Sequence, residues 1–246
     1  DQCHGVLLAH LDLETIPGLR ASDWIHLTEI ERFYCVGDFV SIDAYIRGLG
    51  VDGDQSEWWF QTYQRVCADF RLHEHIGCCL PRSNVRIREG LGALFAWLQA
   101  YEIPLLVVSA GLRQVLQGIL EVNACPLPPS AVLVANDMRD PVAVVTESNK
   151  GGALDLAPPS YAALTEGRTR VLLLGDKPAD LAVAHGLKEG SVVLSVCFLG
   201  AGLREGRDPS THEIQERLQH YDVVLTHDAP LHFVSSILER IAQDGG

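Results

Sequence analysis

The chain has 246 residues, 47% of them hydrophobic, and its 32 acidic residues outnumber its 19 Lys and Arg residues to give a formal net charge of -13. This balance predicts an ordinary globular protein and argues against nucleic acid or an anionic membrane surface as a partner. The seven cysteines are scattered without a disulfide framework, and neither an apolar stretch of about 18 residues nor a cationic leader occurs, so we expect a cytoplasmic protein.

Two patterns of residue type and spacing follow each other along the chain. Residues 22–88 are rich in aromatic side chains at helical spacing, which indicates a helical segment. From residue 89 onward, amphipathic helices alternate with short apolar strands, and the stretch 156–169 is predicted as a surface connection. The helices are predicted over 89–103, 111–123, 179–187, 210–221 and 230–243, and the strands over 104–110, 131–137, 170–176, 191–199 and 222–228. Such alternation predicts parallel βαβ units, in which ligands bind at the carboxyl ends of the strands.

The first of these strand ends carries a small hydroxyl residue. Ser109 lies near the end of the apolar run "LLVVSAG", with Ala110 and Gly111 following it at the start of the next predicted helix. Free backbone N–H groups and the positive end of a helix dipole suit a phosphate group. Asn136 and Asp137, at the end of the next strand, lie either near this phosphate site or in an ordinary turn.

Charged residues follow at two later positions. Lys150 precedes two glycines in "TESNKGGAL", either as an ammonium that reaches into a site or as a surface lysine. The run "LLLGDKPAD" ends a buried strand with Asp176 and places Asp180 at the start of the next helix. Two such carboxylates are hard oxygen ligands suited to Mg²⁺, or else they are a turn acid and a helix-start acid favoured by the macrodipole.

Taken in order, these residues resemble motifs II, III and IV of the haloacid dehalogenase-like (HAD) phosphohydrolases. The blocks 87–121, 148–154, 172–187 and 220–241 are similar to successive segments of the cytosolic pyrimidine 5'-nucleotidase family (type III), and "SEWWFQTYQRV" is similar to its cap segment. The resemblance implies an α/β fold: a HAD-like, Rossmann-type core with a parallel sheet, and a helical cap inserted after the first core strand. The cap would span 22–88, and the core would comprise 1–21 and 89–246.

The resemblance also implies a reaction, which is Mg²⁺-dependent hydrolysis of pyrimidine nucleoside 5'-monophosphates through a phosphoaspartate. Carried over by position, Ser109 and the amides of Ala110 and Gly111 would bind the phosphate, and Lys150 would offset charge on the phosphoaspartate. Asp176 would ligate Mg²⁺, and Asp180 would support the metal site or its bound water. For the base, Asp38 in "ERFYCVGDFV" is the acid nearest to the carboxylate by which the cap of family members selects its substrate.

Two features depart from the family pattern. Lys177 follows Asp176 where the family has Ser, and the family's motif I, an apolar strand ending Asp-x-Asp-x-Thr, does not occur. Three explanations are open. The motif lies upstream of Asp1, which the blockwise resemblance favours; Asp12 and Glu14 of "LDLET" replace it; or it is lost, which leaves a protein that binds nucleotide or phosphate without turnover. In the family this strand lies between those that end at Ser109 and Asp176.

Overall fold

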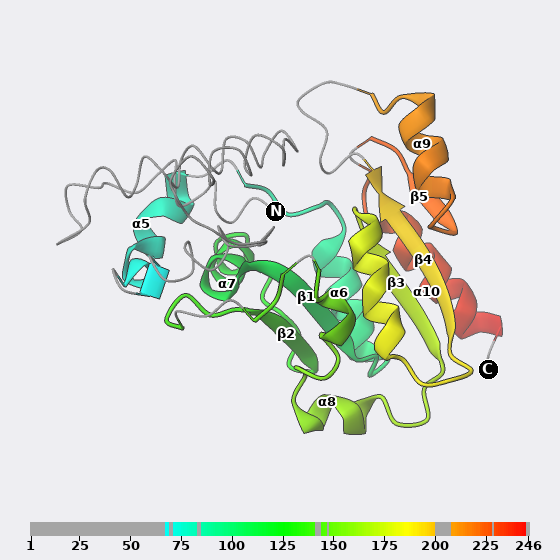
Figure 1. Cartoon of the computed structure of the whole chain (residues 1–246), viewed down its shortest axis with the longest axis horizontal. Helices are drawn as coiled ribbons and strands as arrows, with labels where there is room; N and C mark the ends of the chain where they lie inside the picture. The colour runs from blue at the N-terminus through cyan, green and yellow to red at the C-terminus, as the bar shows by residue number, and fades with distance from the viewer. Residues whose placement is uncertain are drawn as a thin grey trace, which may run out of the picture. The chain divides into compact units, whose positions relative to one another are not determined.

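The computed structural model describes residues 67–68, 71–82, 85–140, 144–146, 148–199, 208–227 and 229–244 (Figure 1). They divide into two compact units. The first contains the described residues up to Arg86 together with Ser109–Ala124 and Ala135–Thr146, and the second contains Ile87–Val108, Cys125–Val134 and the described residues from 148 onward. None of the helices in these ranges is both long enough and apolar enough to cross a membrane.

Strands and helices alternate through most of the described chain. The strands are β1 (Leu105–Leu112), β2 (Ala131–Asn136), β3 (Arg170–Gly175), β4 (Val192–Phe198) and β5 (Val223–Leu225). The α-helices are α5 (Ile76–Cys79), α6 (Leu91–Ala100), α7 (Arg113–Val122), α8 (Pro159–Leu164), α9 (Thr211–Leu218) and α10 (His232–Asp244). Four 3₁₀ helices complete this set: η2 (Leu72–His75), η3 (Leu80–Arg82), η4 (Lys150–Gly152) and η5 (Pro178–Gly186).

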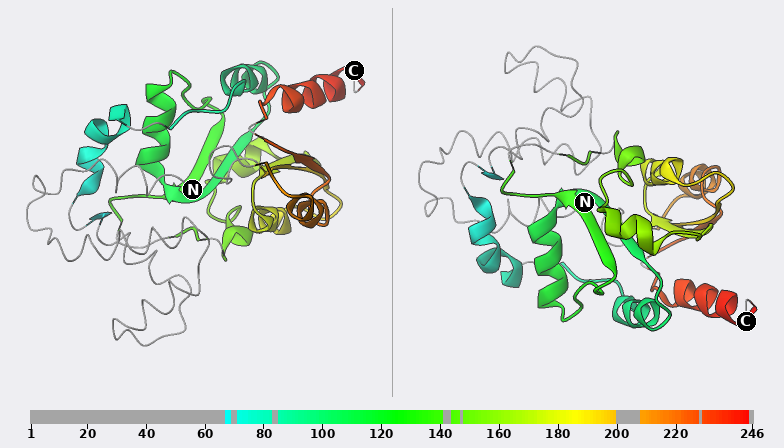
Figure 2. Two further views of the ribbon diagram at one scale, coloured as in Figure 1. Left: turned by 90° about the horizontal axis from the view of Figure 1, so that it is seen from above. Right: turned by 90° about the horizontal axis from the view of Figure 1, so that it is seen from below.

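The second unit is built around the parallel sheet β3-β4-β5. Leu173, Cys197, Leu199 and Tyr221 form its buried core. The 3₁₀ helix η5 lies on one face of this sheet and α10 on the other, where α10 also contacts α6 (Figures 1 and 2). The strands are mainly apolar, as the run "RVLLLG" of β3 illustrates, and Leu173 is the buried residue of that run.

The ends of the helices follow from local sequence. Helix α9 begins with a capping box, in which Ser210 Oγ accepts from the Glu213 N–H at 3.2 Å and the Glu213 carboxylate accepts from the Ser210 N–H at 2.7 Å. Helix α6 ends in a turn where the Ile103 N–H reaches back to the Leu98 carbonyl at 2.8 Å, with Glu102 between them at a positive φ of 50°.

In the first unit, α7 packs against α5 and η3. Gly118 makes this close approach possible, because a Cβ atom at that position would collide with the Leu80 side chain. Strand β1 leads into α7, and β1 pairs with β2 in a separate two-stranded sheet. Among the described strands, therefore, β1 has β2 as its one neighbour, and β3 has β4 as its one neighbour.

The predicted alternation of strands and helices is confirmed, and so is the parallel sheet for β3, β4 and β5. Two details of the prediction are wrong. The segment predicted as the α-helix 179–187 is the 3₁₀ helix η5. The predicted surface connection contains the short helix α8, which begins at Pro159; proline is tolerated there because the N–H of a first helical residue has no partner within the helix. The cap and core boundaries stay a prediction, since most of 22–88 lies outside the described residues.

Candidate functional site

Three of the predicted site residues meet in the second unit. Strand β3 ends at Gly175, so Asp176 follows it directly, and Asp180 lies in the first turn of η5. The Lys150 ammonium, from η4, donates to Asp180 Oδ1 at 2.7 Å. Lys150 is only 9% exposed, so this is an ion pair largely shielded from water. The structure thus joins Lys150 to the acid pair, as expected for groups that serve one site.

The second oxygen of Asp180 holds the turn that carries Asp176. Asp180 Oδ2 accepts from the backbone N–H groups of Asp176 at 2.9 Å and of Lys177 at 3.0 Å. Both oxygens of Asp180 are therefore engaged by protein donors. The Asp176 carboxylate is held neither by Lys150 nor by these amides, so it is the member of the pair that can offer oxygen to a cation.

The pKa values of the two carboxyl groups are shifted in opposite directions. Burial, and after it the nearby charge of Asp180, raises the pKa of Asp176, while the smaller influence of Lys177 lowers it. Burial would also raise the pKa of Asp180, but the Lys150 ammonium and the two backbone N–H groups outweigh it and hold that pKa below its usual value. Lys177, the departure from the family pattern, thus favours the ionised form of Asp176.

A tyrosine far along the chain closes the same turn. The Tyr221 hydroxyl donates to the Lys177 carbonyl at 2.7 Å, and the side chain is 3% exposed. A Cβ atom at Gly175 would lie 2.5 Å from that hydroxyl and 2.7 Å from Asp180 Cβ, so only glycine fits at this position. Tyr221 and Gly175 together fix the path of the chain between β3 and η5.

The described residues offer few ligands for a Mg²⁺ ion. They contain no group of three or more His, Cys, Asp or Glu side chains arranged around one ion. Mg²⁺ in phosphate-handling sites is commonly held by one or two carboxylates, with water and substrate phosphate completing the shell. Asp176, on the turn that Asp180 and Tyr221 hold, fits the part of one such carboxylate.

The residues predicted to bind phosphate lie in the first unit, at the end of β1. The strand continues through Ala110 and Gly111 to Leu112, two residues further than predicted, and α7 begins at Arg113. Ser109 Oγ accepts from the Gly111 N–H at 3.0 Å. The side chain of Asn136, at the end of β2, donates to the Ala110 carbonyl at 2.8 Å, so the segment Ser109–Gly111 is held from the neighbouring strand.

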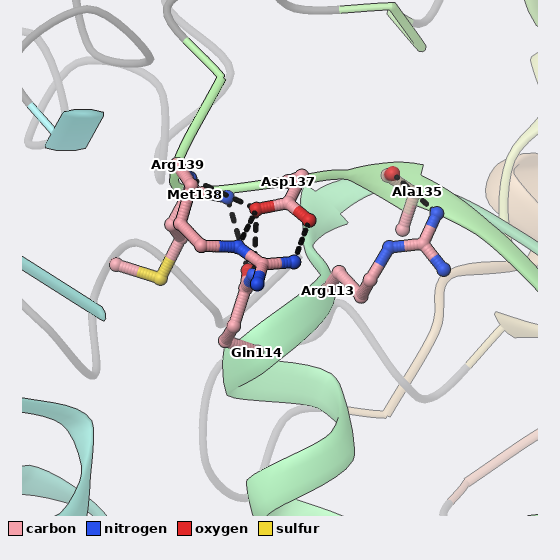
Figure 3. A network of polar contacts seen from close by, with 6 residues as sticks. All are labelled: Arg113, Gln114, Ala135, Asp137, Met138 and Arg139. Atoms are coloured by element: carbon pink, nitrogen blue, oxygen red, sulfur yellow. Dashed lines mark hydrogen bonds and ion pairs between the residues drawn. The ribbon is translucent and has the colours of Figure 1, made fainter. Parts of the chain in front are cut away.

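The first turn of α7 is also bound to the end of β2 (Figure 3). Gln114 Nε2 donates to Asp137 Oδ1 at 2.7 Å, and Gln114 Oε1 accepts from the Met138 N–H at 3.0 Å. The Arg139 guanidinium donates to both oxygens of Asp137, and this hydrogen-bonded pair holds the pKa of Asp137 well below its ordinary value. Arg113 adds a longer bond, 3.3 Å, to the Ala135 carbonyl.

The structure thus brings the predicted residues together in two sets, with Lys150, Asp176 and Asp180 in one unit and Ser109, Ala110 and Gly111 in the other. Asp38, Asp12 and Glu14 lie outside the described residues. The sequence did not predict the contacts of Tyr221, and it left open whether Asn136 lies near the phosphate site or in an ordinary turn. Asn136 carried one usable signal, since a polar residue that ends an apolar strand is usually buried with hydrogen-bond partners.

Comparison with known proteins places this arrangement among nucleotidases. Residues 55–242 match the family model described as "Pyrimidine 5'-nucleotidase (UMPH-1)". The 7-methylguanosine phosphate-specific 5'-nucleotidase of Gallus gallus is 28% identical over 199 residues, which cover 76% of this chain and 65% of that protein. Its Homo sapiens counterpart is 27% identical over 197 residues, which cover 77% of this chain and 63% of the relative. The chain therefore spans a little under two thirds of the length of these relatives.

A solved structure is similar in fold. The crystal structure of cytosolic 5'-nucleotidase IIIB bound to cytidine aligns with a TM-score of 0.64 at 16% sequence identity, and the alignment covers 98% of this chain and 78% of that one. At this level of identity the likeness concerns the fold alone. It supports the predicted α/β, HAD-like architecture.

Proposed function

The chain belongs to the pyrimidine 5'-nucleotidase (UMPH-1) family, and from this premise we propose that it hydrolyses nucleoside 5'-monophosphates to nucleoside and phosphate. The observation that carries the proposal is the shielded Lys150–Asp180 ion pair beside Asp176 at the carboxyl end of β3. Phosphoryl transfer demands neutralisation of the phosphate oxygens and alignment of the reactants, and a fixed cation beside a fixed carboxylate supplies both.

We assign a role to each described residue from its contacts. Ser109 and the backbone N–H groups of Ala110 and Gly111 bind the phosphate, and Lys150 offsets the negative charge on the transferred group. Asp176 is the metal ligand. Asp180 acts by orientation, because its oxygens hold Lys150 and the amides of the Asp176 turn.

The proposed cofactor is Mg²⁺, with Asp176 as one of its ligands. When bound, Mg²⁺ would supply positive charge against the phosphate oxygens of the substrate. The acidic side of the site needs such positive charge, because burial and the nearby charge of Asp180 both disfavour ionisation of Asp176.

The nucleophile is an aspartate that forms a phosphoaspartate, and its identity is the open element of the proposal. It lies upstream of Asp1, or Asp12 and Glu14 take its place. If the Asp-x-Asp-x-Thr motif is lost, a second candidate function applies, in which the chain binds nucleotide or phosphate without turnover. The two functions differ in one observable, namely release of inorganic phosphate.

The substrate class follows from the relatives. Their names specify 7-methylguanosine phosphate, and the similar crystal structure contains cytidine, so we propose pyrimidine and 7-methylguanosine monophosphates as substrates. Asp38 is our candidate for base selection. We also propose that the protein works in the cytoplasm, without a nucleic-acid or membrane partner, in keeping with the cytosolic name of the structural relative and the net charge of -13.

The test is phosphate release from CMP, UMP and 7-methyl-GMP with saturating Mg²⁺. We expect turnover that EDTA abolishes and that Asp176→Asn reduces by about a hundredfold or more, a typical cost for loss of a charge-stabilising group. Asp155→Asn, a change at an exposed acid, serves as the matched control. Equal rates in Asp176→Asn and the wild type would overturn the assignment.

The same panel separates the open alternatives. Loss of turnover in Asp12→Asn would identify "LDLET" as the replacement for motif I. Stabilisation by nucleotide in a thermal melt, without phosphate release, would establish the binding function instead. Neither turnover nor stabilisation with any nucleotide or with phosphate would contradict both functions for this chain.

A further inference from the structure

We propose that Asn136 is a positioning residue for phosphate binding, which acts by fixing the Ala110–Gly111 peptide so that the Gly111 N–H is presented to the phosphate. The inference rests on the proposed function, since it names the residue that orients one of that site's donors. It goes beyond the family assignment, because it follows from the hydrogen bonds of one buried side chain.

Asn136 uses the whole hydrogen-bonding capacity of its amide. Nδ2 donates to the carbonyls of Ala110 and Val145, both at 2.8 Å. Oδ1 accepts from the N–H groups of Val144 at 2.8 Å and Val145 at 2.9 Å. The residue is 1% exposed, so each of these bonds is shielded from water. Two donors and two acceptors are all that a side-chain amide has, and all four meet complementary partners.

The contact with Ala110 determines where the next N–H points. The Ala110 carbonyl and the Gly111 N–H belong to one planar trans peptide, in which these two bonds point in opposite directions. By holding the oxygen, Asn136 directs the Gly111 N–H away from itself and toward Ser109 Oγ, which accepts from it at 3.0 Å. Ser109 and the Gly111 N–H, two of the three groups assigned to the phosphate, are thereby directed toward each other.

A neighbouring hydrogen-bond network holds a different part of the first unit from the peptide that Asn136 holds. Gln114, Asp137 and Arg139 fasten the first turn of α7 to the residues after β2 through bonds to one another and to the Met138 N–H (Figure 3). The Ala110 carbonyl, by contrast, is held by the Asn136 side chain. Gly111 lies within β1, and the two sides of its peptide are held by different side chains, the carbonyl by Asn136 and the N–H by Ser109.

The experiment compares Asn136→Asp with Met138→Ala. The aspartate is isosteric and keeps an acceptor for the Val144 and Val145 amides, but it loses both donors, including the one to Ala110. Met138 is fully buried in the same unit and its side chain makes no bond to the loop, so Met138→Ala matches the loss of stability without the loss of orientation. Thermal melts set an assay temperature at which both variants are folded.

Two readouts on these proteins report orientation rather than stability. The first is the dissociation constant of inorganic phosphate with Mg²⁺, which we expect to rise about tenfold or more in Asn136→Asp and to stay within about twofold in Met138→Ala. The second is hydrogen exchange of the Gly111 amide, which we expect to accelerate in Asn136→Asp alone. If Asn136→Asp matches the wild type in both readouts, the proposal is overturned while the proposed function stands.

A third measurement needs no variant, and so it decides the matter even if Asn136→Asp does not fold. In the wild-type protein, phosphate added to a ¹⁵N-labelled sample should shift the Gly111 amide resonance. A titration in which phosphate binds and the Gly111 amide does not respond would overturn the proposal. A wild-type protein that neither binds phosphate nor releases it from nucleotides would remove the proposed function, and this inference with it.

Discussion

The ion pair between Lys150 and Asp180 should make a large contribution to folding stability. Its N···O distance is 2.7 Å, and the side chains are 11% and 16% exposed. At an effective dielectric constant of about 20, the gross attraction at this distance is about 6 kcal/mol, from which the cost of removing both charges from water must be subtracted. We expect a coupling free energy of about 2–3 kcal/mol to remain.

A double-mutant cycle with Lys150→Met and Asp180→Asn measures this coupling free energy. Asp180→Asn should cost about 3–5 kcal/mol, because it leaves a shielded ammonium without its carboxylate. Lys150→Met should cost less, because Asp180 keeps the amides of Asp176 and Lys177 as donors. Once one partner is replaced, the second substitution should add little.

Urea denaturation in the presence of EDTA provides the free energies of unfolding, so that no bound metal contributes. Lys188→Met and Asp155→Asn are the matched controls, since both positions are exposed, and each should change stability by less than about 0.5 kcal/mol. Additive single substitutions, with a coupling free energy below about 0.5 kcal/mol, would refute the reasoning that the pair is shielded.

Three further predictions concern other contacts. Tyr221→Phe removes the hydroxyl that donates to the Lys177 carbonyl, so it should lower the free energy of unfolding by about 1–2 kcal/mol in denaturation, and Tyr161→Phe, at a half-buried tyrosine elsewhere, is its control. Ala124→Gly should raise the melting temperature by a few degrees, because Ala124 has a φ of 51°, where a Cβ costs about 1 kcal/mol; an unchanged or lower melting temperature would contradict this. The pKa of Asp137 is lower in the folded protein than its ordinary value of 3.8, so the ionised side chain stabilises the fold at pH values above 3.8. This stabilisation is lost as the pH falls from there through the folded-state pKa. The stability difference between the wild type and Asp137→Asn should therefore be constant from about pH 7 to 5 and shrink below about pH 4, and a difference that persists there would argue against the pair with Arg139.

Much of this site could be predicted from the sequence because its signals are local. The apolar run before Asp176 predicts β3, the spacing to Asp180 places both acids on one turn, and the glycines after Lys150 indicate a chain reversal. The family resemblance predicted that Lys150 and the two acids serve one site, but it did not predict that Lys150 would bind Asp180, 30 residues away.

The remaining details depend on contacts between distant residues, which no local sequence pattern predicts. Asp180 was expected to support the metal, but whether its oxygens would face an ion or protein donors depends on the fold of η5 against η4. Asn136 donates a hydrogen bond to Ala110, which is 26 residues away in the chain, and no periodic pattern in the sequence predicts that contact. The helix α8 was missed because Pro158 and Pro159 predict a loop, although proline is well tolerated in a first helical turn.

The hydroxyl of Tyr221 has a consequence for the order in which the protein is completed. A ribosome makes the chain from the N-terminus, and Lys177 leaves it 44 residues before Tyr221 does. Until Tyr221 emerges, the turn that carries Asp176 lacks the hydrogen bond from its hydroxyl, and β5, which follows that tyrosine, has yet to be made. The acidic end of β3 is therefore among the last parts of this unit to be finished, so a nascent chain arrested before residue 221 would carry every predicted catalytic side chain and still lack a fixed site.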